Sequence, residues 1–135
     1  MKEFETTTGA MLKVGVASFE DCLALKNIVE KELSKQKIDI NKIDLKSTDI
    51  SAIISPILAV DSSQDFINAF FKVAKKSLYN DEKITRSTFE DESAREDYYF
   101  ILFEVCKAAL FPFFKGLASS FKHIIPKTAT KNIQK

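Results

Sequence analysis

The chain has 135 residues, a length that predicts one domain with a core large enough to fold without disulfide bonds or a structural metal. Its formal net charge of +1 excludes an overall field that would draw it to nucleic acid or to an anionic membrane. The composition, 45% hydrophobic and 29% charged, is that of a globular protein, and 12 Phe with no Trp indicate apolar surfaces built mainly from Phe. We expect one domain over residues 1–125 and a basic, disordered tail over residues 126–135.

The N-terminal residues alternate in the manner of two short strands. Phe4 and Thr6 alternate with acidic and polar neighbours, and Leu12, Val14 and Val16 do so after a Thr-Thr-Gly turn. A period of two on either side of a glycine turn predicts a β-hairpin. Because an isolated two-stranded ribbon is only marginally stable, this hairpin must pack on helices or pair with another chain.

Helices are predicted to follow the hairpin. The first covers Phe19–Ser34, where Ser18 and Asp21 have the spacing of a capping box and apolar side chains recur at helical intervals. A second, short helix begins near Thr48 and is interrupted by Pro56.

A stronger helix is predicted in the middle of the chain. It begins at Ser62, with Asp65 three residues later, and carries Phe66 and Phe70 on one face. It ends near Tyr79, because the Asn-Asp-Glu sequence that follows is typical of a turn.

The last long helix is predicted to start among the acids between Asp91 and Asp97, where the helix dipole favours negative charge, and to run to about Phe111. Its apolar side chains lie nearly all round it, so it is either central in the fold or covered by a partner. Pro112 is predicted to break it, and a final short helix is predicted from Phe113. The whole pattern predicts a mainly α fold, a single compact helical domain with a short N-terminal β-hairpin.

The sequence contains no recognisable catalytic, cofactor or metal site. The single histidine, His123, has no neighbouring Cys or Asp, and three glycines are too few for a phosphate-binding loop. Cys22 and Cys106 lie among apolar residues, where free Cys behaves as a small hydrophobe. The acids from Glu90 to Asp97 surround a predicted helix start, where solvated carboxylates are expected rather than a catalytic pair. We therefore expect a protein that is not an enzyme and that binds no metal or cofactor.

No membrane or export segment is predicted. The most apolar stretch, Tyr98–Phe114, is interrupted by Glu104, Lys107 and Pro112 and falls short of the ~20 apolar residues of a membrane span. The N-terminal nine residues are too polar for a signal peptide. These features predict a soluble cytoplasmic protein without specific contacts to nucleic acid or membrane.

The segment from Phe100 to Phe114 has more large apolar side chains than one helical face can bury. The residues in excess, off the main stripe or beside Pro112, are the candidates for partner binding: Phe103, Leu110, Phe111, Phe113 and Phe114. Either the helix is central, or these side chains form an exposed patch for another protein. We expect Phe103 to belong to the core and at least one of the three Phe side chains beside Pro112 to face a partner.

Charge is unevenly distributed along the chain. After Glu104 there are six lysines and no acid, whereas acids outnumber bases between Asp81 and Asp97. This asymmetry fits identical subunits that associate head to tail, and it equally fits two solvated surfaces.

Several short segments carry a resemblance to a known family, the tail assembly chaperones of long-tailed bacteriophages. The segments are Leu78-Tyr79-Asn80, Lys83-Ile84-Thr85, Phe89-Glu90, Ala94-Arg95-Glu96-Asp97-Tyr98 and Pro112-Phe113-Phe114. The N-terminal hairpin followed by a capped, Phe-containing helix is also similar to that family. The resemblance spans about Lys2 to Phe121 and consists of turns and apolar positions rather than a catalytic signature.

The resemblance implies a role in phage tail assembly. Such chaperones are thought to coat the tape measure protein, a long and aggregation-prone chain, while tail tube subunits assemble around it, and they are absent from the finished virion. Some are made in two lengths by ribosomal frameshifting, and this chain resembles the shorter form. The implied partners are the tape measure protein, the tail tube protein and further copies of the chain, in the host cytoplasm. The alternatives are a DNA-associated regulator that uses the basic C-terminal end and a structural component of the tail.

Overall fold

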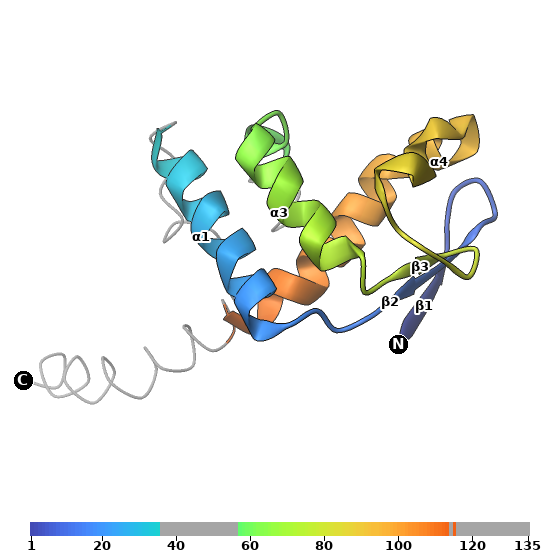
Figure 1. The fold of residues 1–135 in the computed structure, drawn as a ribbon, viewed down its shortest axis with the longest axis horizontal. Helices are drawn as coiled ribbons and strands as arrows, with labels where there is room; N and C mark the ends of the chain where they lie inside the picture. Colours follow the sequence, from blue (N-terminus) through green and yellow to red (C-terminus); the bar gives the residue numbers. More distant parts are fainter. Residues whose placement is uncertain (36–56, 114, 116–135) are drawn as a thin grey trace, which may run out of the picture.

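The computed structural model describes residues 1–35, 57–113 and 115, and it is mostly helical with a small antiparallel sheet (Figure 1). The predicted second helix near Pro56, Phe114, the helix expected beyond Phe113, His123 and the tail over residues 126–135 lie wholly or mainly outside the described residues. The elements in chain order are β1 (Lys2–Glu5), β2 (Met11–Val14), α1 (Phe19–Lys35), α3 (Gln64–Ala74), β3 (Leu78–Tyr79), β4 (Glu82–Lys83), the 3₁₀ helix η2 (Arg86–Glu90) and α4 (Glu92–Glu96). A short helical segment covers residues 57–60, and a long last helix begins at residue 98.

The predicted N-terminal hairpin is confirmed. β1 and β2 pair antiparallel, with Phe4 opposite Leu12, and Gly9 takes a φ of +87° in the turn between them. Leu12 and Val14 are buried while the alternate positions face outward, as a half-buried strand requires. Val16 is the exception to the prediction, because β2 ends at Val14 and the Val16 side chain is 93% exposed.

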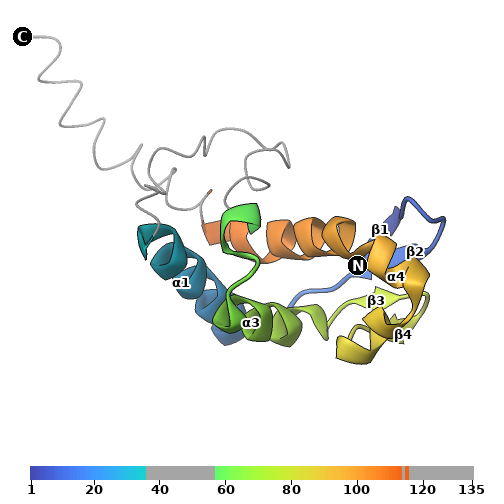
Figure 2. The ribbon, with the colours of Figure 1, turned by 90° about the horizontal axis from the view of Figure 1, so that it is seen from above.

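The two predicted long helices of the N-terminal half are also present. α1 begins as expected, with the Asp21 backbone N–H donating to Ser18 Oγ over 3.2 Å. α3 is capped by Ser63 rather than Ser62, since the Phe66 N–H donates to Ser63 Oγ. α1 and α3 lie side by side, and the last helix crosses one face of this pair (Figures 1 and 2).

The prediction that the middle helix extends to Tyr79 is wrong. α3 ends at Ala74, and Leu78–Tyr79 instead pairs with both β2 and β4, which extends the hairpin into a four-stranded sheet of order β1-β2-β3-β4. Asn80 and Asp81 form the turn with φ values of 51° and 66°, the left-handed conformation that two-residue hairpin turns require. The turn was recognisable from its sequence, whereas strands of two residues are too short to show a period.

The acidic segment does not start one continuous helix. α4 is a separate short helix, Glu92–Glu96, capped by Asp91, and Asp97 is the turn residue between it and the last helix, which begins at residue 98. The expectation that Asp97 is a solvated carboxylate is also wrong, because its side chain has no exposed surface. The physical reason is a set of hydrogen-bond donors that the N-terminal hairpin brings to it.

The predicted helix break at Pro112 is wrong as well. The last helix remains helical through residue 113, and Lys115 is helical too. Pro112 removes the N–H that would bond to the carbonyl of Ala108, but both residues are exposed, so water can satisfy that carbonyl. The neighbouring Ala109 and Leu110 are buried and hold the helix against the core.

The core lies between the last helix on one side and α1, α3 and the inner face of the sheet on the other (Figure 2). Its largest fully buried side chains come from all of these elements and include Phe66, Phe70, Leu12, Leu25, Leu33, Ile101 and Leu102. The chain after β2 passes close to the end of α3. A Cβ on Gly15 would lie 2.0 Å from the Lys76 carbonyl oxygen, so only glycine fits at this crossing.

Candidate functional site

The most highly organised polar cluster surrounds the Asp97 carboxylate. Oδ2 accepts hydrogen bonds from Thr6 Oγ1 at 2.7 Å, Thr8 Oγ1 at 2.5 Å and the Tyr79 hydroxyl at 2.7 Å. Oδ1 accepts from Thr7 Oγ1 at 2.9 Å and from the Thr8 backbone N–H at 3.3 Å. The turn of the first hairpin, strand β3 and the α4 junction are thus tied to one carboxylate.

This cluster is structural rather than catalytic. Burial alone raises the pKa of Asp97, but the hydrogen bonds from Thr8, Thr6, Tyr79 and Thr7 outweigh it and the pKa lies below its ordinary value. A carboxylate held ionised and saturated with donors has no lone pair directed at a substrate. Burial and the bond to Asp97 raise the pKa of Tyr79, which keeps that hydroxyl a donor.

The five partner-binding candidates predicted from the sequence have different surroundings. Leu110 is 1% exposed and belongs to the core, so its assignment to a surface patch is wrong: it lies on the buried side of the helix next to Ala109. Phe103 and Phe111 are half-buried and pack against the core, with the Phe103 ring 5.9 Å from that of Tyr99. Phe113 is half-buried, and Phe114 lies outside the described residues.

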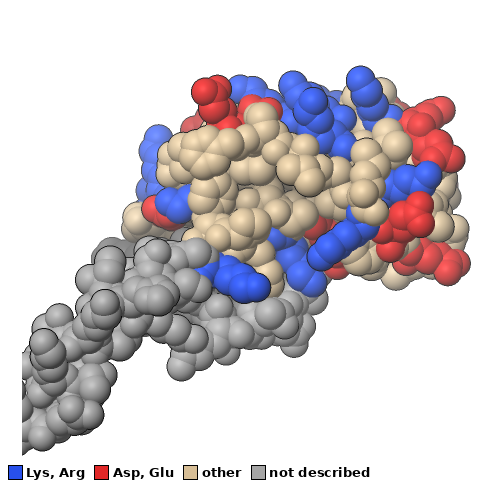
Figure 3. All heavy atoms as spheres, turned by 90° about the horizontal axis from the view of Figure 1, so that it is seen from below, with Lys and Arg blue, Asp and Glu red and all other residues tan. Residues whose placement is uncertain are grey.

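Two pairs of apolar side chains form what we call the apolar underside: Met1 with Val16, which line one hollow together, and the exposed Phe19 with the half-buried Phe113. Val16 is 93% exposed, Met1 73% and Phe19 67%, and the rings of Phe19 and Phe113 have their centroids 6.0 Å apart. Neither Val16 nor Phe19 was among the predicted partner-binding residues, because the sequence pattern places Val16 in a strand and Phe19 at the start of a helix. Seen from below, this side of the described protein has a broad uncharged area with charged side chains of both signs along its margins (Figure 3).

Two hollows lie next to the apolar underside. The larger, about 430 Å³, is lined by Met1 and Val16 at its edge and by Cys22, Val73 and Ala109 among others, and we call it the Cys22 hollow. The smaller, about 310 Å³, lies between β1 and the last helix, and we call it the Pro112 hollow. The two share Lys2, Val14 and Ala108, so they meet beneath the start of the hairpin.

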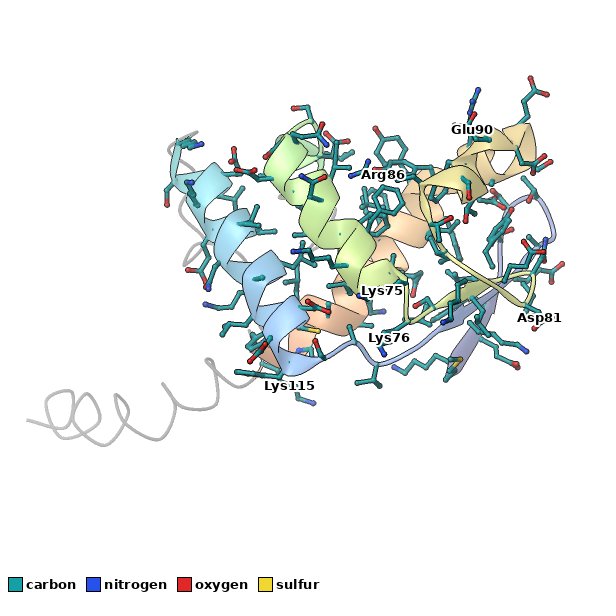
Figure 4. The ribbon with its side chains drawn as sticks, in the orientation of Figure 1. Lys75, Lys76, Asp81, Arg86, Glu90 and Lys115 are labelled. Carbon is teal, nitrogen blue, oxygen red and sulfur yellow. The ribbon has the colours of Figure 1, made fainter. Side chains whose placement is uncertain are left out.

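The Pro112 hollow has an apolar floor and a charged rim. Phe4, Phe111 and Pro112 contribute apolar surface, while the charged residues on its lining are Lys2, Lys107, Lys115 and Glu104. Lys115 points away from the body of the protein, and Lys75 and Lys76 at the end of α3 lie on the same lower side (Figure 4). The apolar floor of this hollow suits the apolar side chains of a peptide segment.

The polar and titratable side chains of the described residues have these surroundings. No group of three or more His, Cys, Asp or Glu side chains in this part of the chain is placed to hold a metal ion. Every buried side-chain nitrogen or oxygen there has a hydrogen-bond partner, so none is left for a ligand to satisfy. Cys106 is buried, and burial raises the pKa of its thiol, which opposes thiolate chemistry. Among the described helices, none has the length and apolar character needed to cross a membrane.

Comparison with known proteins returned no match: no family model, no curated protein and no solved structure is similar to this chain.

Proposed function

We propose that this protein is a chaperone of phage tail assembly that holds segments of the tape measure protein on its apolar underside, as an oligomer in the host cytoplasm. The observation that carries the proposal is the apolar underside itself, where Met1, Val16 and Phe19 are mostly exposed beside two hollows. Contiguous exposed apolar side chains are rare on monomeric soluble proteins and mark sites of interaction. An amphipathic helix binds by placing its apolar face in a groove of this kind.

The segments that carry the family resemblance have structural roles. Leu78-Tyr79-Asn80 is β3 and its turn, and Ala94-Arg95-Glu96-Asp97-Tyr98 is the junction at the buried carboxylate. In this chain these segments shape the sheet and the α4 junction. The client surface rests on other residues, which lie before and within α1 and at the end of the last helix.

Co-expression with a fragment of the tape measure protein tests the proposal. The wild-type protein should keep the fragment soluble, and Val16→Asp should not, because a carboxylate at the centre of the apolar underside must be desolvated when an apolar helix binds. Val16 is 93% exposed, so the substitution leaves the core untouched. Leu58→Asp is the matched control, since Leu58 is 48% exposed and lines neither hollow.

Failure of the wild-type protein to keep any tape measure fragment soluble would overturn the proposal. If the wild-type protein instead retards DNA in an electrophoretic assay, with salt-dependent affinity, the DNA-associated alternative replaces it. Equal loss in Val16→Asp and Leu58→Asp would show that the apolar underside is not the client surface.

A further inference from the structure

Strand β1 forms an open edge of the sheet in the described part of the chain, where it pairs with β2 alone. The Thr6 N–H donates to the Ala10 carbonyl across the hairpin at 2.8 Å. Hydrogen-bonded pairs alternate along an antiparallel ladder, so the backbone groups of Phe4 and Lys2 also face β2. The N–H and C=O groups of Glu3 and Glu5 consequently point away from the sheet, toward the open edge.

The pairing on the far side of β2 agrees with this alternation. The Asn80 N–H donates to the Met11 carbonyl at 2.8 Å, so Met11 directs its backbone to β3, not to β1. Met11 stands opposite Glu5, and Glu5 therefore has its own backbone groups turned outward.

The inner face of β1 continues into the Pro112 hollow. Phe4 packs toward the last helix, with its ring centroid 6.3 Å from that of Phe100, and it lines the hollow together with Phe111. A strand added at the edge of β1 would extend the sheet over this hollow. Every second side chain of that strand would then point to the apolar floor.

The outer face of β1 is acidic. Glu3 and Glu5 both project there, and Lys13 on β2 is 3.8 Å from Glu3 but closer, at 2.9 Å, to Asp81. Within the described residues Glu5 forms no ion pair. The two carboxylates would lie beside the outward side chains of an added strand.

We propose that β1 is a docking edge for an extended segment of another protein, in which apolar side chains alternate with Lys or Arg. Its backbone would pair with Glu3 and Glu5, its apolar side chains would enter the Pro112 hollow, and its basic side chains would lie against the two carboxylates. This mode is β-strand addition, in which main-chain hydrogen bonds give affinity and alternate side chains give specificity. The Pro112 hollow adjoins the apolar underside, but the β1 edge is a different binding element, and the proposal does not depend on the tape measure protein being the client.

A second copy of the chain fits this edge poorly. Residues opposite each other in a sheet share a face, so antiparallel pairing of β1 with β1 of another copy sets Glu3 against Glu3 or Glu5. Like charges directly opposite each other destabilise the pair. A partner with basic residues at those positions replaces this repulsion with attraction.

A fluorescent peptide of alternating Lys and Val residues tests the proposal by fluorescence anisotropy with the full-length protein. The peptide should bind at least tenfold more tightly than one in which Glu replaces Lys. Glu5→Pro should weaken binding at least tenfold, because it removes an outward N–H and leaves the β1–β2 ladder intact. Glu92→Pro is the matched control: it makes the same change of charge and side chain at the first position of α4, where proline is tolerated, and should bind normally.

Amide hydrogen exchange gives an independent measurement. In the free protein the Glu3 and Glu5 amides should exchange rapidly, and the peptide should protect them while leaving Glu92 unchanged. If Glu5→Pro fails to fold, Glu5→Lys serves instead, because it keeps the N–H and should reverse the preference between the two peptides.

Three results would overturn the proposal. Equal binding of the Lys peptide to the wild type and to Glu5→Pro would mean electrostatic attraction without strand addition. A second result is that the Glu3 and Glu5 amides of the free protein are protected at every dilution and become exposed once residues 116–135 are removed. That result would mean that a segment of the same chain occupies the edge. Protection that appears only at high protein concentration would assign the edge to a second copy. If the Glu5→Pro variant still keeps the tape measure fragment soluble, the proposed function stands in any of these cases.

Discussion

Asp97 concentrates more hydrogen bonds than any other described side chain, and its protonation state therefore matters for stability. Its donors are the three threonines of the first hairpin turn and Tyr79. All but Tyr79 are 89 to 91 residues away in sequence. No local pattern could show that Asp97 is buried, because its acidic neighbours are solvated and its partners arrive only when the sheet forms.

We expect folding stability to fall in acid partly through this carboxyl group. The folded-state pKa of Asp97 is below its ordinary value of 3.8. The unfolded chain therefore binds the proton first: the stabilisation is complete above about pH 4 and is lost as the pH falls through the lower, folded-state pKa. Urea unfolding at a series of pH values measures it.

Asp97→Asn is the matching variant at neutral pH. Its amide group turns a donor toward hydroxyl donors, so the free energy of unfolding should fall by at least about 1.5–3 kcal/mol, the usual range for one hydrogen bond to a charged group. The variant should also lose part of the wild-type dependence on pH below 4. An unchanged stability with an unchanged acid profile would contradict the role assigned to Asp97.

Gly15 gives a second prediction at the scale of one residue. Its N–H donates to Ser77 Oγ at 3.0 Å, and the Lys76 carbonyl occupies the place of a Cβ. Gly15→Ala should lower the free energy of unfolding by about 1–3 kcal/mol, because the backbone of either segment must shift. Gly9→Ala is the control, because its loss of stability has a different cause. Gly9 has a positive φ of +87° and open space where a Cβ would lie. Thermal unfolding measures the loss of stability in both variants. Amide hydrogen exchange distinguishes them, because only Gly15→Ala should also weaken the protection of the Ser77 amide.

At the scale of elements, the long helices and the first hairpin follow from local pattern. Ser18 before α1 and the Phe spacing of α3 agree with the structure because caps and apolar stripes act within a few residues. The strands β3 and β4 do not follow, because each has only two residues; β3 exists through pairing with β2, and β4 through pairing with β3. Local propensity favours helix at Leu78, but pairing with β2 makes this residue part of a strand.

Pro112 shows the opposite case, in which a strong local signal is overridden by packing. The helix continues through residue 113, and so the proline costs one backbone hydrogen bond. Pro112→Ala should restore the bond to the Ala108 carbonyl and raise the free energy of unfolding by up to about 3 kcal/mol. Lys115→Ala, at a neighbouring exposed helical position, should change it little. Lower stability in Pro112→Ala would mean that the proline ring itself supports the fold through the hollow that it lines.

At the scale of the whole molecule, charge is distributed unevenly over the described surface. Lys75, Lys76 and Lys115 lie on the lower side, while Asp81 and Glu90 lie toward the end formed by β3, β4 and α4 (Figure 4). Bases also lie among these acids, since Asp81 pairs with Lys13 at 2.9 Å and Glu90 with Arg95 at 3.6 Å. Most of the C-terminal lysines lie outside the described residues, so head-to-tail association through a basic and an acidic region stays a prediction. Head-to-tail association through these two regions would be weakened by salt, since exposed charges are screened.

The candidate binding surface was only partly predictable. The apolar excess of the last helix predicts a binding surface in the region of Phe111 and Phe113, which stays a prediction, and it could not tell which face each side chain takes. Leu110 lies in the core, and two of the three most exposed large apolar residues in the described part of the chain, Val16 and Phe19, come from a different segment. A surface assembled from two distant segments is invisible to any pattern within one of them.

The last prediction separates residues that support the fold from residues that bind. Leu110→Ala and Phe66→Ala remove side chains that are 1% and 0% exposed, so they should lower the free energy of unfolding by about 2–5 and 3–5 kcal/mol respectively. Phe19→Ala removes a side chain that is 67% exposed and should change stability by no more than about 0.5 kcal/mol. Urea unfolding of the three variants measures these differences.

Binding should show the reverse order. Phe19→Ala takes away the ring that contacts Phe113 at the edge of the apolar underside, so it should fail to keep a tape measure fragment soluble while it remains fully folded. Leu110→Ala, assayed at a temperature at which it is folded, should still bind, because its side chain never reaches the surface. If Phe19→Ala unfolds the protein, the Phe19–Phe113 pair is part of the core. If it folds and binds as the wild type does, the client is held elsewhere, and the apolar underside needs another partner.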